Sequence, residues 1–124
     1  MAMKVLKVGI MSRKKYRERT IAIARGEYTP KKGEPKIWFE SIQSMAQVLS
    51  NDNQDLLRVI FEKRPASIKE LENLTGRKSS NLSRTLKTMA GYGIVELEKD
   101  NKNIRPIVKA TDFTVEFGIR NVQT

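Results

Sequence analysis

The chain has 124 residues, with 24 Lys and Arg against 14 Asp and Glu, a formal net charge of +10, and neither Cys nor His. The missing residue types exclude disulfides, thiolate metal sites, cysteine nucleophiles and Ser-His-Asp triads. The length fits one domain, or one small domain with an extension, and the charge favours a polyanion over a neutral substrate as partner.

The N-terminal part predicts a strand, a basic helix, a loop and a second short strand. Residues 3–10 alternate between polar and apolar, as in a half-buried strand. A strongly basic helix is predicted from a cap at Ser12 through Arg25. Residues 27–36 are rich in Pro, Gly and Lys and predict a loop, and residues 36–39 are β-prone.

Four more helices are predicted in the centre of the chain, and serines precede the first three. Ser41 begins a helix with apolar residues at i, i+3, i+4 and i+7 spacing. Residues 50–53 cap the next helix, which Pro65 ends. Ser67 and a glutamate three residues later form a capping box for a short helix, and the fourth helix spans about residues 79–91.

The C-terminal part predicts three strands. Residues 94–99 and 104–110 flank a turn at residues 100–103 and predict an antiparallel hairpin. Pro106 cannot donate a ladder hydrogen bond, so its strand should be an edge. Residues 113–119 have the cleanest period-two pattern in the chain and predict a last strand.

These elements predict an α+β, mostly helical chain in three parts. Residues 1–49 form a basic N-terminal strand-helix-strand extension with a linking helix, residues 50–110 a winged helix-turn-helix, and residues 111–124 a C-terminal strand. The order helix, short helix, tight glycine turn, helix and hairpin is typical of a winged helix-turn-helix, whose recognition helix enters the DNA major groove.

The predicted recognition helix has a polar face without acids, opposite the predicted core positions Leu82, Leu86 and Met89. Arginine pairs bidentately with guanine, and asparagine with adenine. We therefore expect base reading by Ser80, Asn81, Ser83 and Arg84. DNA backbone contacts are expected from Arg77, Lys78, Ser79, Lys87 and Thr88, with free N–H groups at the helix start. Contacts from the wing are expected from Lys99, Lys102 and Arg105.

The run TGRKSSNLSRTLKTMAGYGIVELEK resembles the recognition helix and wing start of MarR-like winged-helix regulators. With the segments MKVLKVGIMSR, PKIWFESIQSMAQVLS and SIKELENLTGRKSSNLSRTLK, it is similar to a family of predicted prokaryotic DNA-binding proteins over most of residues 3–110. That family consists mainly of transcriptional regulators, and some members look like antitoxins of two-gene operons. The resemblance implies a DNA-reading role for Asn81, Ser83 and Arg84. At Ser80 the family pattern leads us to expect a larger polar residue than serine.

The function expected from the sequence is a sequence-specific double-stranded DNA-binding regulator, by default a repressor, that acts as a homodimer. An antitoxin that also binds a toxin protein is the main alternative. An RNA-binding module lacks an aromatic stacking platform, and an enzyme lacks an inward-facing acidic cluster, so we expect no catalytic residue, metal or cofactor. The terminal strands are expected to pair across the dimer or to form a small sheet, and Trp38 is expected to be a core or interface anchor.

Two properties remain open at this stage. The basic helix at residues 13–25 is either a plain surface, a second phosphate-contact site or a surface for a partner protein. The operator and any small-molecule effector are not identified. No apolar run is long enough to span a membrane and no long apolar leader segment follows Met1, so a cytoplasmic protein is expected.

Overall fold

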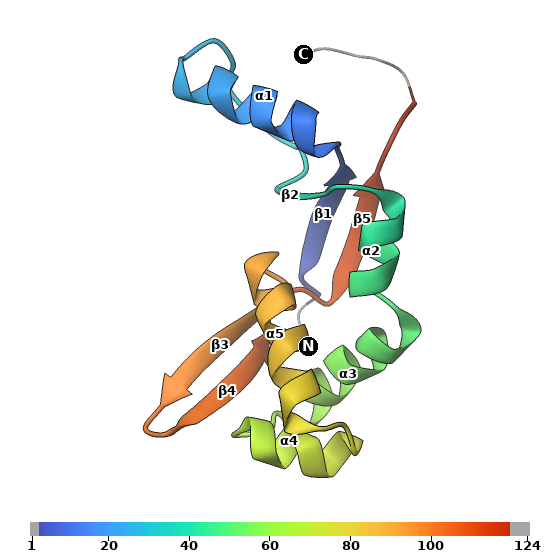
Figure 1. The fold of residues 1–124 in the computed structure, drawn as a ribbon, viewed down its shortest axis with the longest axis vertical. Coiled ribbons are helices and arrows are strands. Elements are labelled where there is room, and N and C mark those ends of the chain that lie inside the picture. The colour runs from blue at the N-terminus through green and yellow to red at the C-terminus, as the bar shows by residue number, and fades with distance from the viewer. Residues whose placement is uncertain (1–2, 120–124) are drawn as a thin grey trace.

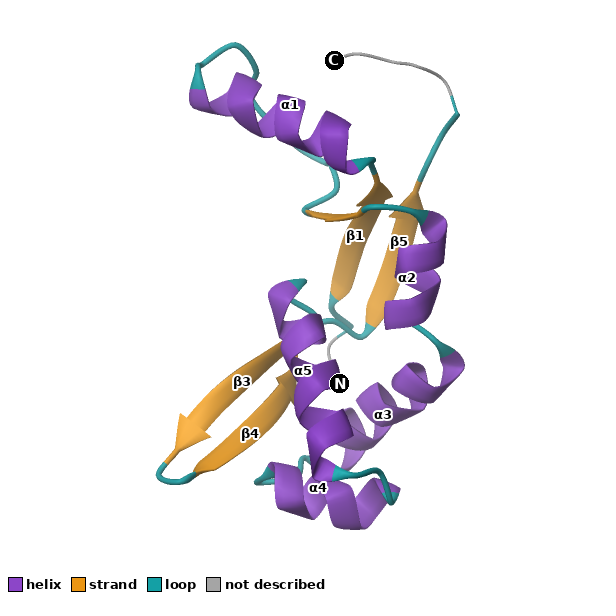
Figure 2. Cartoon of the chain, in the orientation of Figure 1, coloured by secondary structure: helices purple, strands orange, loops and turns teal. Residues whose placement is uncertain are grey.

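The computed structural model describes residues 3–119. These residues form five helices and five strands, α+β as predicted, in the order β1 (Val5–Ile10), α1 (Arg13–Ala24), β2 (Ile37–Phe39), α2 (Ile42–Val48), α3 (Asn51–Lys63), α4 (Ile68–Thr75), α5 (Ser79–Gly91), β3 (Val95–Asp100), β4 (Asn103–Val108) and β5 (Asp112–Glu116). The molecule is elongated (Figure 1), with α1 at one end, α4 and the β3–β4 hairpin at the other, and a sheet between them. Figure 2 shows β1 and β5 between α1 and the group of α3, α4 and α5, with α2 beside these two strands.

Serine side chains start four of the five helices, as predicted. The hydroxyls of Ser12, Ser41, Ser50 and Ser67 each accept a hydrogen bond from the backbone N–H three residues later. Such a bond satisfies one of the N–H groups that a helix leaves without a partner in its first turn. In α4 the capping box is shifted by one residue, because the carboxylate of Glu70 accepts from the N–H of Ala66 at 3.0 Å.

The terminal segments form one parallel sheet within the chain, with strand order β2-β1-β5. Val8 of β1 lies between Ile37 of β2 and Val115 of β5. The last strand is shorter than predicted: it ends at Glu116 instead of residue 119. The reason is its partner, since pairing with β1 ends at Gly9 and the chain then leaves the sheet toward α1.

One core joins the sheet to the helices. Val8 and Phe39 are buried on the sheet, and the ring of Phe39 lies 4.4 Å from the ring of Tyr92, just after α5. Trp38 is half-buried and packs over Gly9, where a Cβ would lie 2.4 Å from the indole. The anchor role predicted for Trp38 is therefore filled within the chain.

The helices α3, α4 and α5 pack with the hairpin around a second part of the same core. Its buried side chains are Leu56, Leu57, Ile60, Leu71, Leu82, Leu86, Met89, Ile94 and Val95. The hairpin pairs Asp100 with Asn103 across a two-residue turn, in which Asn101 has a left-handed φ of 58°. Pro106 lies opposite Leu97, in a sheet of only two strands, so its strand is an edge as predicted. Every helix in residues 3–119 is too short or too polar to cross a membrane.

Candidate nucleic-acid interface

The helix α5 buries one side and leaves the other in solvent. Leu82, Leu86 and Met89 are fully buried, as the spacing predicted. On the other side the exposed residues are Ser80, Asn81, Arg84, Lys87 and Thr88, and Ser83 is half-buried. The side chains of Lys78, Arg84 and Lys87 form no ion pair or hydrogen bond within residues 3–119. The exposed face of α5 therefore offers cations and polar groups to a partner.

The turn between α4 and α5 is short, as predicted, because Gly76 adopts a left-handed φ of 75°. The start of α5 differs from the expectation of free N–H groups. The carboxylate of Glu72 accepts a hydrogen bond from the N–H of Ser79 at 2.9 Å. Lys78 occupies the cap position but makes no side-chain cap bond. The first turn of α5 is thus capped from α4, and the N–H of Ser79 is not free for a phosphate.

Arg77 lies inside a polar cluster instead of projecting into solvent. Its guanidinium donates to Oδ1 of Asn81 at 2.7 and 2.9 Å, and to Oγ1 of Thr85 at 3.3 Å. It also donates to Oδ1 of Asn53 on α3 at 3.3 Å. The side chain that we expected on the DNA backbone therefore joins α5 to α3. We call Arg77, Asn53, Asn81 and Thr85 the clamp.

The clamp continues to α2. The amide nitrogen of Asn53 donates to the carbonyl oxygens of Gln47 and Val48 at 3.4 and 3.0 Å. These carbonyls belong to the last turn of α2, which has no helical N–H to bind them. In the clamp, the amide oxygen of Asn81 accepts hydrogen bonds from Arg77, and its amide N–H groups remain available. Asparagine reads adenine with both the oxygen and the N–H groups, so only the donor half of that contact is available.

The hairpin carries fewer unpaired cations than the sequence count suggested. Lys99 and Lys102 are exposed and form no ion pair within residues 3–119. The guanidinium of Arg105 pairs with the carboxylate of Glu98 directly across the two strands. Arg105 therefore has to leave Glu98 before it contacts a phosphate.

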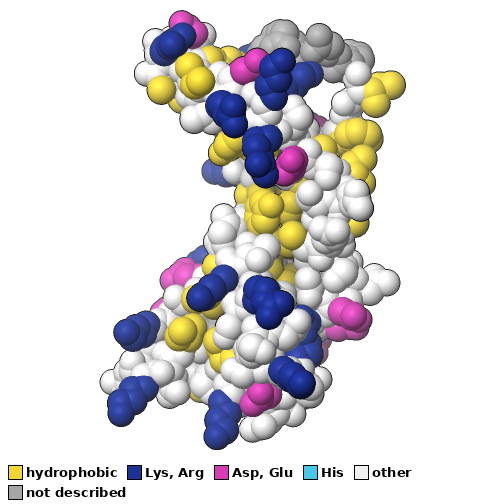
Figure 3. Space-filling view, viewed as in Figure 1, with side chains coloured by type: hydrophobic (Ala, Val, Ile, Leu, Met, Phe, Trp, Pro, Cys, Tyr) yellow, Lys and Arg dark blue, Asp and Glu magenta, His cyan; other side chains and the backbone are white. Residues whose placement is uncertain are grey.

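The basic side chains gather toward the two ends of the molecule. Figure 3 shows Lys and Arg side chains over the α1 end and over the α4, α5 and hairpin end of one face. Hydrophobic side chains lie at the narrow middle of the same face. A polyanion that follows the long axis would meet positive charge at both ends.

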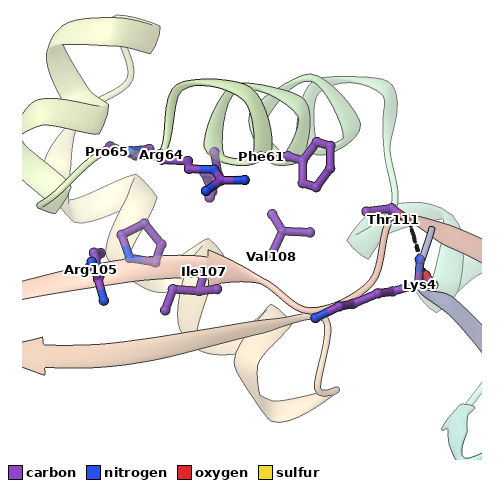
Figure 4. A pocket seen from close by; sticks show the side chains of 10 residues that line it. Lys4, Phe61, Arg64, Pro65, Arg105, Ile107, Val108 and Thr111 are labelled. Atoms are coloured by element: carbon purple, nitrogen blue, oxygen red, sulfur yellow. Dashed lines mark hydrogen bonds between the residues drawn. The ribbon is translucent and has the colours of Figure 1, made fainter. Parts of the chain in front are cut away.

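A hollow lies where the hairpin meets α3. Its lining includes Phe61 of α3 and Val108 of β4, and Figure 4 shows Lys4, Arg64 and Arg105 around it. The N–H of Lys4 donates to Oγ1 of Thr111 at 2.8 Å, which ties the start of β1 to the start of β5 (Figure 4). In residues 3–119, no group of three or more acidic side chains is placed to hold a metal ion.

A second basic region lies in α1 and the loop that follows it. The guanidinium of Arg19 pairs with Glu34 at 2.9 Å and lies 5.3 Å from the ring centroid of Trp38 and 5.8 Å from that of Tyr28. The hydroxyl of Tyr28 and the N–H of Lys31 also donate to Glu34. These hydrogen bonds lower the pKa of Glu34 to about 2, and the bond from the Tyr28 hydroxyl has the largest effect. The same carboxylate raises the pKa of Tyr28.

The predicted site residues thus fall into separate groups in the structure. Those on α5 and at its start lie together, and those on the hairpin lie on a neighbouring element whose strand β3 contacts α5. Sequence reasoning missed the roles of Glu72 and Asn53. Glu72 binds Ser79, seven positions away, and Asn53 binds Arg77, 24 positions away, and no local spacing rule signals such bonds.

Comparison with known proteins gives one family. No curated protein and no solved structure matches the chain. The model of the HVO_A0114 family matches residues 48–115, which run from the end of α2 through most of β5 and include the whole of α3 to β4. Since this match covers more than half of the 124 residues, the chain belongs to the HVO_A0114 family.

Proposed function

We propose that the protein is a sequence-specific double-stranded DNA-binding regulator, and that α3 to β4 act as a winged helix-turn-helix. In this proposal α5 is the recognition helix in the major groove and the hairpin is the wing beside it. Occupation of an operator would then repress transcription. No catalytic step is part of the proposal.

The observation that carries the proposal is the exposed face of α5. Arg84 and Lys87 form no ion pair within residues 3–119, and α5 itself contains no acid. A solvent-exposed helix without a binding role gains stability from acids that neutralise such cations at i,i+4 spacing. Here the neutralising charge is left to a partner, and an arginine on a rigid helix suits bidentate contact with guanine.

The local fold adds support. The turn at Gly76 brings α4 and α5 close together, and Leu71 of α4 and Leu82 of α5 belong to one core with Leu56 of α3. The clamp fixes the start of α5, which is the part of a recognition helix that meets base edges. A rigid, pre-positioned helix reads bases with less ordering cost than a mobile one.

The experiment that tests the function is fluorescence anisotropy with duplex DNA from upstream of the gene, beside a scrambled duplex, at several salt concentrations. Specific binding should exceed scrambled binding by about 10³ or more and should fall steeply with salt. Equal, weak binding to both duplexes would refute sequence-specific recognition.

Two neighbouring variants separate base reading from backbone contact. Arg84→Ala should weaken operator binding by about 1–3 kcal/mol and relax specificity at one base position. Lys78→Ala should weaken both duplexes equally and reduce the salt slope by about 1. If both variants behaved alike, the orientation of α5 in the groove would be wrong.

A homodimer is the assembly that we propose for the regulator. Helix-turn-helix regulators read two-fold operators as dimers. The strand β5 is an edge of its sheet, and Val115 and Phe117 beside that edge are 47% and 55% exposed. A second copy paired at β5 would bury both side chains. Light scattering at micromolar concentration should give twice the monomer mass, and a monomer would refute the dimer.

The same edge favours an antitoxin as the second candidate function. A toxin protein could add a strand to β5 while α5 binds the operator of both genes. Copurification of the chain with the product of an adjacent small gene, lost on Val115→Lys, would favour this function. Retention of that product by the Val115→Lys variant would refute binding at β5.

A further inference from the structure

The segment from residue 12 to residue 36, which we call the arm, holds most of the net charge of the protein. It contains nine Lys and Arg and three Glu, a net +6 of the total +10. It consists of α1 and the loop before β2. The HVO_A0114 family match begins only after the arm, at residue 48.

Most basic side chains of the arm make no bond within the described part of the chain. The helix has no buried residue, and Arg19 is its one basic residue that is not classed as exposed. Outside Arg19, Lys15 and Arg13, the basic side chains of the arm form no ion pair or hydrogen bond within residues 3–119; they are Lys14, Arg17, Arg25, Lys31, Lys32 and Lys36.

The positions of these cations oppose the stability of the helix. Lys14 and Arg17 are three residues apart on one side of α1, a spacing at which two side chains are neighbours. Like charges at such spacing repel each other. The first turn of α1 holds three cations and no acid, the reverse of what the helix dipole favours. An anionic partner on the side of Lys14 and Arg17 would relieve the repulsion between these two cations.

The arm is held in a fixed place relative to the sheet. Arg19 lies on the opposite side of α1 from Arg17, and it pairs with Glu34 while it lies over the Trp38 indole. The indole in turn packs on Gly9 at the centre of the sheet. Arg19, with the pair between Arg13 and Glu40, therefore attaches α1, and Lys14 and Arg17 remain exposed without a partner within residues 3–119.

We infer that the arm is a second DNA-binding surface, which contacts phosphates of the duplex beyond the part that α5 reads. This inference rests on the proposed function of α5. One face of the molecule shows basic side chains at both ends (Figure 3), so a duplex along the long axis would meet α5 and the arm together. The arm contributes affinity and salt dependence, and no sequence preference.

The test compares two operator duplexes that share a centre, one that covers the α5 site alone and one that is longer by about one helical turn on each side. The arm variant is Lys14→Gln with Arg17→Gln. The matched control, Lys4→Gln with Lys63→Gln, removes the same charge from exposed residues outside the arm, α5 and the hairpin. The measured quantity is the slope of log affinity against log salt.

On the longer duplex, loss of two phosphate contacts should reduce the magnitude of the slope by about 2. Between 50 and 200 mM salt, the affinity of the arm variant should therefore fall about 10-fold less than that of the wild type. The slope on the short duplex should not change, and the control should match the wild type on both. The arm variant should unfold at the wild-type temperature or above it, because repulsion has been removed. A purely structural role for these residues would lower that temperature.

An unchanged slope on the long duplex, or an equal loss in the control, would overturn the inference. A preference of the arm for an RNA hairpin of equal length would also overturn it. Failure of the proposed function has a different signature, in which the operator and a scrambled duplex bind equally. In that case the slope on the longer duplex alone decides the role of the arm, since phosphate contacts need no particular sequence.

Discussion

Replacement of Arg77 by alanine distinguishes the clamp from a DNA contact. The change removes the bonds from the guanidinium to Asn81, Thr85 and Asn53 and leaves their oxygens to solvent. A hydrogen bond to a charged group contributes about 1.5–3 kcal/mol. Because Asn81 is exposed and two of the bonds are long, we expect a total loss of about 2 kcal/mol rather than their sum.

The assay is thermal unfolding followed by circular dichroism. An unfolding entropy of about 2.1 cal/mol/K per residue converts a loss of about 2 kcal/mol to a fall of about 8 °C in Tm. Arg77→Lys should restore little of this, because an ammonium cannot reach three acceptors with fork geometry. In a double-mutant cycle, Arg77→Ala and Asn53→Ala should couple.

The neighbour Lys78 is the matched control. It is exposed and forms no ion pair or hydrogen bond within residues 3–119, so Lys78→Ala should leave Tm unchanged while it reduces the salt slope of DNA binding by about 1. Arg77→Ala should do the reverse. An unchanged Tm for Arg77→Ala, together with a salt slope reduced by about 1, would refute the clamp and restore Arg77 as a phosphate contact.

Three further changes test other parts of the structure. The pKa of Glu34 lies well below its unfolded value, so the stability that its carboxylate contributes is complete above about pH 4.5 and is lost as the pH falls toward 2. Glu34→Gln should therefore flatten the dependence of Tm on pH in that range, and an unaltered profile would contradict this role of Glu34. Gly9→Ala places a Cβ 2.4 Å from the Trp38 indole, so it should lower the free energy of unfolding by about 1–3 kcal/mol. It should also shift the fluorescence emission of Trp38, the sole tryptophan, to the red, and unshifted emission would show that the ring does not pack on Gly9. Leu71→Ala, at a fully buried site, should cost about 2–5 kcal/mol in denaturant unfolding, and a loss below about 1 kcal/mol would place Leu71 outside the core.

Local signals in the sequence predicted most of the elements. The serines at the helix starts act within three residues, so their bonds follow directly from the sequence. The alternation at residues 113–119 predicted a strand but extended it three residues too far, because the end of β5 depends on where β1 leaves the sheet. Periodicity describes one segment and carries no information on its partner.

For the candidate site, the sequence predicted which side of α5 is exposed but not which hydrogen bonds its residues form. The inward positions of α5 followed from helical spacing, and that fixed which residues are exposed. The bond from Arg77 to Asn53 could not be predicted, since the two residues lie 24 positions apart. The cap from Glu72 on Ser79 likewise depends on how α4 crosses α5. Both contacts exist only once the three helices have packed.

The pairing of β1 with β5 has a consequence for the order of folding. Lys4 and Thr111 bond to each other across 107 positions of the chain, a longer separation than that of any two elements between them. Contacts of long sequence separation form late, because closing a long loop costs entropy before any contact rewards it. During synthesis β1 is made before the helices α1 to α5 and the hairpin, so its pairing with β5 must wait until all of those elements have been made.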